Sequence, residues 1–269
     1  MDIFEYAFMQ KAFMVGIMLA IIIPCIGVVV VLKRLSMIGD ALSHTSLAGI
    51  AAGLIMGINP VLGAIVLSII AALGIEIIRK RMPRYAEMSI AIIMSAGIGL
   101  AGVLSGFVKN ATNFNSFLFG SIVAISDFEL YLVSLISILV FLTFILLYKE
   151  LFYVSMDEKS ARLAGIPVNT VNFIFTILTA VTVSVAARTV GALIVSSLMV
   201  VPVACAMQFG KSYKQTVIYS IISAVLFTVV GLFISYYAHL KPGGTIVLVG
   251  ILALLLIMIF KKILTRSFD

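Results

Sequence analysis

The feature that most constrains this chain is a series of long apolar runs separated by short polar segments. A helix needs ~20 residues to cross the hydrocarbon core of a bilayer, and about nine runs approach that length. Only 11% of the residues are charged and 63% are hydrophobic, so the chain lacks the charge with which soluble domains cover a water-facing surface. We therefore expect an all-α polytopic membrane protein of the cell membrane, with residues 1–269 forming one domain. The predicted spans are approximately Ala12–Leu32, Ile38–Met56, Pro60–Ile78, Glu87–Phe107, Glu129–Tyr148, Asn169–Ala187, Val190–Gln208, Gln215–Tyr237 and Thr245–Phe260.

The basic residues predict how these spans are oriented. If the N-terminus lies outside, 14 of the 18 Lys and Arg residues fall on the cytoplasmic side, as the positive-inside rule requires. This split predicts an N-out, C-in topology with an odd number of spans. The same residues come in small groups without interleaved aromatics, so the net charge of +7 does not indicate a nucleic-acid partner. Asp2 and Glu5 stand where a signal peptide would be basic, so we expect the first run to remain as a helix.

Two loops are long enough to form structure of their own. The outer loop, Val108–Phe128, is predicted to contain a short re-entrant or surface helix. The inner loop, Lys149–Val168, is predicted to form a short amphipathic helix on the cytoplasmic surface, because Gly165 and Pro167 are helix-stop signals. Within the spans, small residues recur at fourth positions and predict close helix packing. They are Gly49, Gly53 and Gly57 in the second span and Gly102 and Gly106, with the nearby Gly97, in the fourth.

The most informative polar residues are Asp40 and His44, four residues apart in the second apolar run. That spacing places both side chains on one helix face, with Cβ atoms about 5–6 Å apart. A carboxylate beside an imidazole is a suitable ligand pair for a first-row divalent cation. Because ionisable side chains are costly within a membrane, their presence favours a functional role. The alternative is a neutral Asp–His hydrogen bond that only packs two helices. Two ligands do not complete a metal shell, so others must come from other helices, carbonyl groups or water.

The other polar residues are less specific. His239, at the outer end of its predicted span, could help a cation enter, although a solvated interfacial side chain explains it as well. Glu76, with Arg79 and Lys80 three and four residues on, predicts an ion pair at a helix end. The two cysteines, Cys25 and Cys205, lie inside apolar runs and are expected to pack as small hydrophobic side chains. No G-x-x-x-x-G-K-[ST] motif occurs in the sequence, so any ATP that drives this protein must bind another polypeptide.

Several of these stretches resemble a known family. The run from Gly39 to Gly49, which contains Asp40 and His44, resembles the signature of permease subunits of zinc and manganese ABC importers. The resemblance extends over nearly the whole chain, through Met156–Ala161 with Gly165–Pro167, Val190–Val195 with Val201–Ala204, and Pro242–Val247.

The resemblance implies a fold similar to the vitamin B12-type ABC importer permeases. It also implies a homodimer, a cytoplasmic ABC ATPase subunit that binds the ATP, an extracytoplasmic metal-binding protein, and a divalent metal cargo, zinc or alternatively manganese, with no permanently bound cofactor. The cytoplasmic segment at about residues 150–168 resembles the part that docks on the ATPase. Its candidate coupling residues are Asp157, Glu158, Ala161 and Gly165, with Ala161 and Gly165 expected to present a small face to the partner.

Three classes of function compete at this point. The first is the ATP-driven importer permease, in which the metal passes Asp40 and His44 and which is not itself an enzyme. The second is a self-powered secondary transporter, which predicts inverted repeats and further intramembrane acids; neither is evident in this sequence. The third is an intramembrane hydrolase using His44 with a serine, but the adjacent Ser43 points away from His44 on a helix, and no nucleophile elbow occurs.

Overall fold

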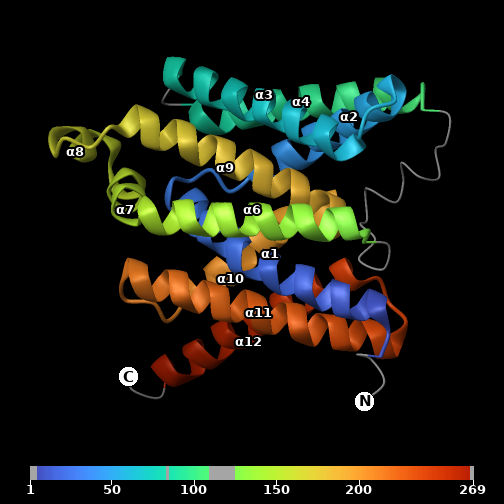
Figure 1. The fold of residues 1–269 in the computed structure, drawn as a ribbon. Helices are drawn as coiled ribbons and strands as arrows, with labels where there is room; N and C mark the ends of the chain where they lie inside the picture. Colours follow the sequence, from blue (N-terminus) through green and yellow to red (C-terminus); the bar gives the residue numbers. More distant parts are fainter. Residues whose placement is uncertain (1–4, 83–84, 109–124, 267–269) are drawn as a thin grey trace.

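The computed structural model describes residues 5–82, 85–108 and 125–266, and these residues form helices joined by turns (Figure 1). Most of the predicted outer loop, Val108–Phe128, falls outside the described residues. Eight of the described helices are long and apolar enough to cross a membrane, in agreement with the predicted fold class. These are α1 (Ala7–Leu32), α2 (Ile38–Met56), α3 (Pro60–Arg81), α4 (Ala86–Ser105), α6 (Asp127–Leu146), α9 (Val168–Thr189), α11 (Tyr213–Ala238) and α12 (Pro242–Arg266).

The seventh predicted span, Val190–Gln208, corresponds to a shorter helix, α10 (Ala192–Met207). It nevertheless connects opposite ends of the bundle. The end of α9 lies beside the start of α6, where Arg188 Nε is 2.7 Å from Glu129 Oε1. The start of α11 lies beyond the other end of α6, where the ring of Tyr213 is 5.2 Å from that of Tyr148. The chain therefore returns along the bundle through α10.

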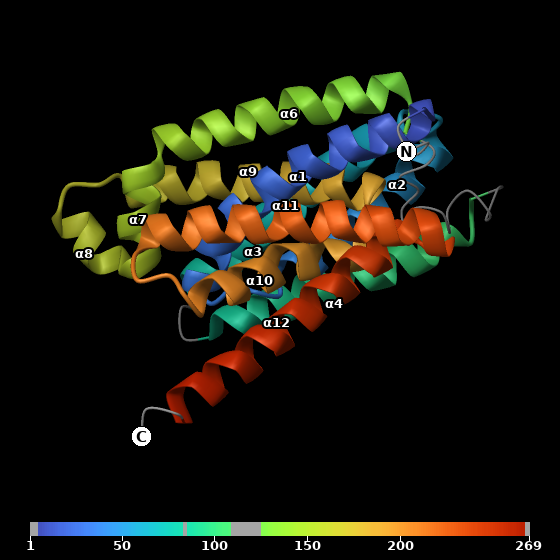
Figure 2. The same ribbon diagram turned by 90° about the horizontal axis from the view of Figure 1, so that it is seen from below.

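The helices lie roughly side by side in three groups (Figures 1 and 2). One group contains α2, α3 and α4, the opposite group contains α10, α11 and α12, and α1, α6 and α9 lie between them. The most deeply buried of the long helices are α1, α2 and α9, whereas α4 and α12 expose most of their apolar side chains. Cys25 and Cys205 are both buried and unpaired, as predicted from their apolar surroundings.

Close helix packing depends on some of the predicted glycines and not on others. A Cβ atom added at Gly49 of α2 would lie 2.4 Å from the carbonyl oxygen of Gly63, so α2 and α3 meet backbone to backbone. Gly57 has a different role, because its φ of +70° ends α2 in the left-handed conformation. A Cβ atom added at Gly102 would have no neighbouring helix within 4 Å among the described residues, so the predicted packing face on α4 is confirmed only at Gly97.

The inner loop folds as two short helices where one was predicted. Helix α6 ends at Leu146, and the chain continues through α7 (Tyr148–Met156) and α8 (Glu158–Leu163), which project from one end of the bundle (Figure 2). Asp157 separates them because its extended backbone interrupts α7 and its side chain caps α8. Gly165, with φ of +82°, ends α8, and Pro167 directly precedes α9, so both predicted stop signals act as expected.

Candidate functional site

Helix α2 forms the core of the candidate site because it packs against four neighbouring helices. It contacts α3, α4, α9 and α10. On the α4 side, a Cβ atom added at Gly97 would lie 2.6 Å from Cγ2 of Thr45, so a larger residue could not occupy that position without displacing α2. Thirteen of the nineteen residues of α2 are consequently buried.

Asp40 and His44 are two of the six residues of α2 that are not buried. Both side chains are half-buried, whereas Ala41, Leu42 and Ser43 between them are buried. Among the described residues, neither Asp40 nor His44 has a hydrogen-bond or ion-pair partner. The packing alternative required a hydrogen bond between these two side chains, and the structure contains none. The pair thus has its ligand atoms available.

The pair gains no third His, Cys, Asp or Glu ligand from the described part of one copy. No group of three or more His, Cys, Asp or Glu side chains that could hold a metal occurs within the part of the chain that the structure describes. His239 does not join the pair, because it caps α11 at the end of the bundle where α1 begins. Asp40 lies near the start of α2, just beyond the opposite end of α1. The predicted inner pair and outer histidine are therefore separate.

The coupling residues of α8 differ in where they face. Asp157 accepts hydrogen bonds from the backbone N–H groups of Lys159 and Ser160, both at 3.1 Å. The hydroxyl of Ser160 and these amides hold the pKa of Asp157 below its usual value. Ala161 is only 1% exposed, so it packs against the rest of the chain and does not share an outer face with the exposed Gly165.

Leu163 is the exposed apolar residue that sequence analysis missed. Its side chain is 90% exposed at the end of α8. Helix α8 has only six residues, which is too few for the spacing of apolar residues to show which side faces the protein. An exposed leucine on a projecting helix is the kind of side chain that a partner protein can bury.

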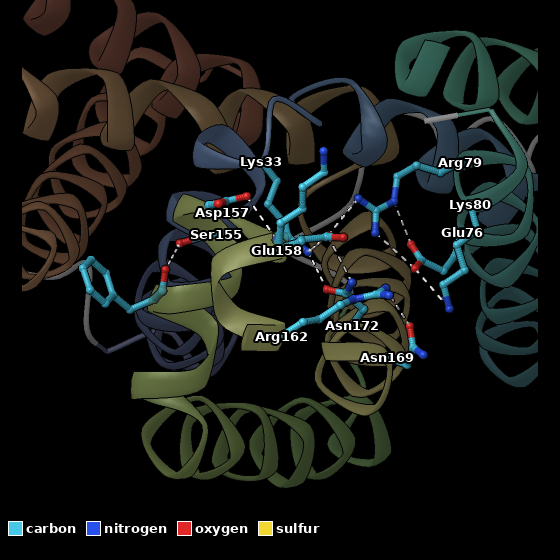
Figure 3. A network of polar contacts seen from close by, with 12 residues as sticks. Lys33, Glu76, Arg79, Lys80, Ser155, Asp157, Glu158, Arg162, Asn169 and Asn172 are labelled. Atoms are coloured by element: carbon cyan, nitrogen blue, oxygen red, sulfur yellow. Dashed lines mark hydrogen bonds and ion pairs between the residues drawn. The ribbon is translucent and has the colours of Figure 1, made fainter. Parts of the chain in front are cut away.

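Glu158 lies at the centre of a polar network that joins α8 to three other helices (Figure 3). Its Oε1 atom is 3.2 Å from Nζ of Lys33 and accepts hydrogen bonds from Arg79 Nη1 and Asn172 Nδ2, both at 3.1 Å. These three residues belong to the end of α1, to α3 and to α9. Arg79 also donates two hydrogen bonds to Glu76, at 3.0 and 3.1 Å, which confirms the predicted helix-end ion pair.

The network is sufficiently buried that the pKa of each of its charged groups depends on the charges beside it. The Lys33 side chain is 6% exposed, and its burial lowers the pKa of Lys33 while Glu158 opposes that shift. Burial alone would raise the pKa of Glu158, but the charges of Lys33 and Arg79 and the hydrogen bond from Asn172 hold it below its usual value. Each charge therefore favours the charged form of the other: Glu158 opposes the lowering of the Lys33 pKa, and Lys33 helps to lower the pKa of Glu158.

Comparison with known proteins identifies the family. Residues 5–261 match the model of the ABC 3 transport family. The manganese transport system membrane protein MntC of Listeria monocytogenes is 31% identical over 95% of this chain and 91% of its own length. The high-affinity zinc uptake system membrane protein ZnuB of Haemophilus influenzae is 30% identical over 96% of this chain and 98% of its own length.

A solved structure agrees in fold with these relatives. PsaBC from Streptococcus pneumoniae, solved in complex with a Fab, contains a chain that superimposes with a TM-score of 0.85 at 28% identity. The match covers 95% of this chain and 92% of that one. The helical architecture, the multi-pass membrane character and the matched family thus agree over almost the entire length. This chain belongs to the ABC 3 transport family.

Proposed function

We propose that this chain is the membrane permease of an ATP-driven importer and that a divalent metal ion passes Asp40 and His44 on its way to the cytoplasm. The observation that carries the proposal is the pair itself: a carboxylate and an imidazole, one helical turn apart, accessible and without an internal partner on an otherwise buried helix. Groups of this kind are expensive within a membrane unless a ligand or a partner compensates for them.

A second copy of the chain would complete the metal shell. One copy offers one carboxylate and one imidazole, and a homodimer that brought two α2 helices together would offer four ligands, the usual number for zinc. The half-buried state of Asp40 and His44 leaves room for such a contact. We accordingly propose the homodimer, together with a cytoplasmic ATPase that docks on α7 and α8 and an extracytoplasmic protein that delivers the metal.

Zinc is the cargo that we predict, with manganese as the alternative. The related MntC and ZnuB are named for manganese and for zinc, respectively, and their identities to this chain are nearly equal. Imidazole suits zinc and carboxylate suits manganese, so the pair alone accommodates both ions. The distinction requires a transport measurement.

The proposal is tested by reconstituting the chain with its ATPase in vesicles and measuring uptake across a panel of divalent cations. We expect ATP-dependent uptake of zinc or manganese, and loss of uptake in the Asp40→Asn variant, which removes the charge but keeps a hydrogen-bonding group. Uptake without ATP would instead support the secondary transporter. Normal uptake by Asp40→Asn would remove the pair from the metal path.

The orientation can be tested in the same vesicles. Single cysteines introduced at Lys80, Lys159 and Lys211 should react with impermeant reagents only from the cytoplasmic side. A cysteine at Asn113 should react only from outside. Labelling of position 113 from the cytoplasmic side would reverse the predicted topology and with it the direction of transport.

A further inference from the structure

The network around Glu158 connects the projecting α8 with both segments that position α2. Lys33 caps the end of α1 and begins the turn, residues 33–37, that leads into α2. Arg79 lies near the end of α3, whose backbone contacts that of α2 at Gly49 and Gly63. One carboxylate oxygen of α8 thus holds the start of α2 through its preceding turn and the side of α2 through α3 (Figure 3).

The turn between α1 and α2 is suited to transmit a displacement because it is short and firmly held. Arg34 has a φ of +58°, a conformation that a non-glycine residue rarely adopts, and hydrogen bonds from Lys33 N to Val29 O and from Leu35 N to Val30 O close the turn. Nζ of Lys33 also donates to Oδ1 of Asn172 at 2.5 Å. A turn fixed in this way moves as a unit with whatever holds Lys33.

We infer that the Lys33–Glu158 ion pair is the mechanical link through which movement of α8 repositions Asp40 and His44. The inference rests on the proposed function, since it assumes that an ATPase displaces α8. In it, Glu158 and Lys33 are positioning residues that touch neither metal nor nucleotide. When α8 moves, the pair carries the α1–α2 turn with it, and α2 follows as a rigid helix, which changes how the metal ligands face the pathway.

The alternative is that the pair only stabilises the fold. The two explanations differ in the effect expected when the connection between positions 33 and 158 is removed and then restored. A structural pair would affect the amount of assembled protein, whereas a mechanical link would affect how many metal ions cross for each ATP hydrolysed. Mutations within coupling networks change such quantities by roughly two- to thirtyfold.

The test replaces the ion pair with a covalent crosslink between the same two positions. Lys33→Cys and Glu158→Cys are combined in a background that carries Cys25→Ala and Cys205→Ala. A hollow of about 710 Å³ lined by Lys33, Arg79 and Glu158 gives a short bis-maleimide reagent access to both positions. Before crosslinking, we expect the ATP hydrolysed per metal ion transported to rise roughly tenfold; after crosslinking, we expect it to return toward the value of the unsubstituted complex.

The matched control is a second ion pair of the same chemistry at the other end of the bundle. Lys11 Nζ lies 2.7 Å from Asp127 Oδ1, and the Lys11→Cys/Asp127→Cys variant should keep the normal ratio with or without the reagent. An unchanged ratio in the Lys33/Glu158 cysteine pair would overturn the link. So would a crosslink that stops transport, because α8 would then have to move relative to the α1–α2 turn.

A second double variant without charges at these positions is used if the double-cysteine variant does not assemble. Lys33→Gln/Glu158→Gln removes both charges, keeps the length of the Glu158 side chain, shortens that of Lys33 by one atom and leaves Arg79 with Glu76. It should assemble and show the same raised ratio; failure of both pairs to assemble would assign the contact to folding alone. Failure of the proposed function looks different, since the unsubstituted complex would then transport no divalent metal at all.

Discussion

The two clusters of ionisable groups near α2 differ in whether the protein satisfies them. In the network at α8, Glu158 and Glu76 each contact two or more basic side chains, and Asn172 both donates and accepts a hydrogen bond. On α2, Asp40 and His44 contact no partner among the described residues. Side chains that the fold satisfies are available to hold helices together, whereas unsatisfied ones are available to bind something that comes from outside.

The largest expected effect tests the unsatisfied pair. Asp40→Ala and His44→Ala should each abolish metal uptake, because each removes one of the two proposed metal ligands. They should leave the thermal stability of the protein almost unchanged, since neither side chain has an internal partner to lose. The measurements are vesicle uptake and thermal unfolding in detergent. A large loss of stability with residual uptake would show that the pair is structural after all.

The satisfied network should respond in the opposite way. Glu158→Ala leaves Lys33 and Arg79 without a shared counter-charge, which costs about 3–5 kcal/mol for fully buried pairs. Because the Glu158 side chain is 32% exposed and partly screened, we expect a loss of about 2 kcal/mol in the free energy of unfolding. Denaturant unfolding of the purified chain measures it, with the half-exposed Glu150→Ala on α7 as the control that should change little.

A smaller effect is expected at the exposed tip of α8. Leu163→Ser should weaken binding of the ATPase roughly tenfold, because burial of a leucine side chain contributes about 1.5–3 kcal/mol. The stability of the isolated permease should not change, since Leu163 is 90% exposed. Ala161→Arg should do the reverse and destabilise the permease, because the new side chain has no room at a 1% exposed position. ATPase co-purification and thermal unfolding separate the two; equal behaviour of both variants would contradict the assigned faces.

The smallest effect belongs to a pair that is satisfied but exposed. Asp127→Asn breaks the ion pair with Lys11, and the Asp127 side chain is 77% exposed. Such pairs contribute about 0–1 kcal/mol, so we expect a change of less than about 0.5 kcal/mol in the free energy of unfolding and normal transport. A larger change would mean that exposure is a poor guide to which of these ion pairs matter.

Local features of the sequence predicted much of this molecule. The bounds of α2 agree with the prediction at both ends, because Gly57 and the basic residues before the helix are local signals. The ion pair of Glu76 with Arg79 was also predictable, since both residues lie on one helix, three positions apart. Helix α1 begins at Ala7, earlier than predicted, because Gln10 and Lys11 lower the hydropathy of its first turns without preventing a helix.

Features that depend on contacts between distant segments could not be predicted in this way. Nothing near Lys33 or Glu158 in the sequence indicates that they meet, and the pairing decides which way α8 faces. In the folded protein Ala161 is buried and Leu163 is exposed, so the prediction that Ala161 faces a partner was wrong. The contact between α8 and Lys33, which the sequence does not reveal, was needed to see this. The spacing of Asp40 and His44 on one helix face was predictable, but that no third His, Cys, Asp or Glu joins them among the described residues required the packed structure.

The separation of Lys33 from its partners in the chain also has a consequence for biogenesis. Lys33 is synthesised 139 residues before Asn172, so at about 5–20 residues per second the ribosome needs roughly 7–28 s to complete its binding site. During that interval the ammonium group of Lys33 lacks both Glu158 and Asn172, which hold it in the folded protein. We therefore expect the end of α1 to take its final position only after α8 and the beginning of α9 have been synthesised.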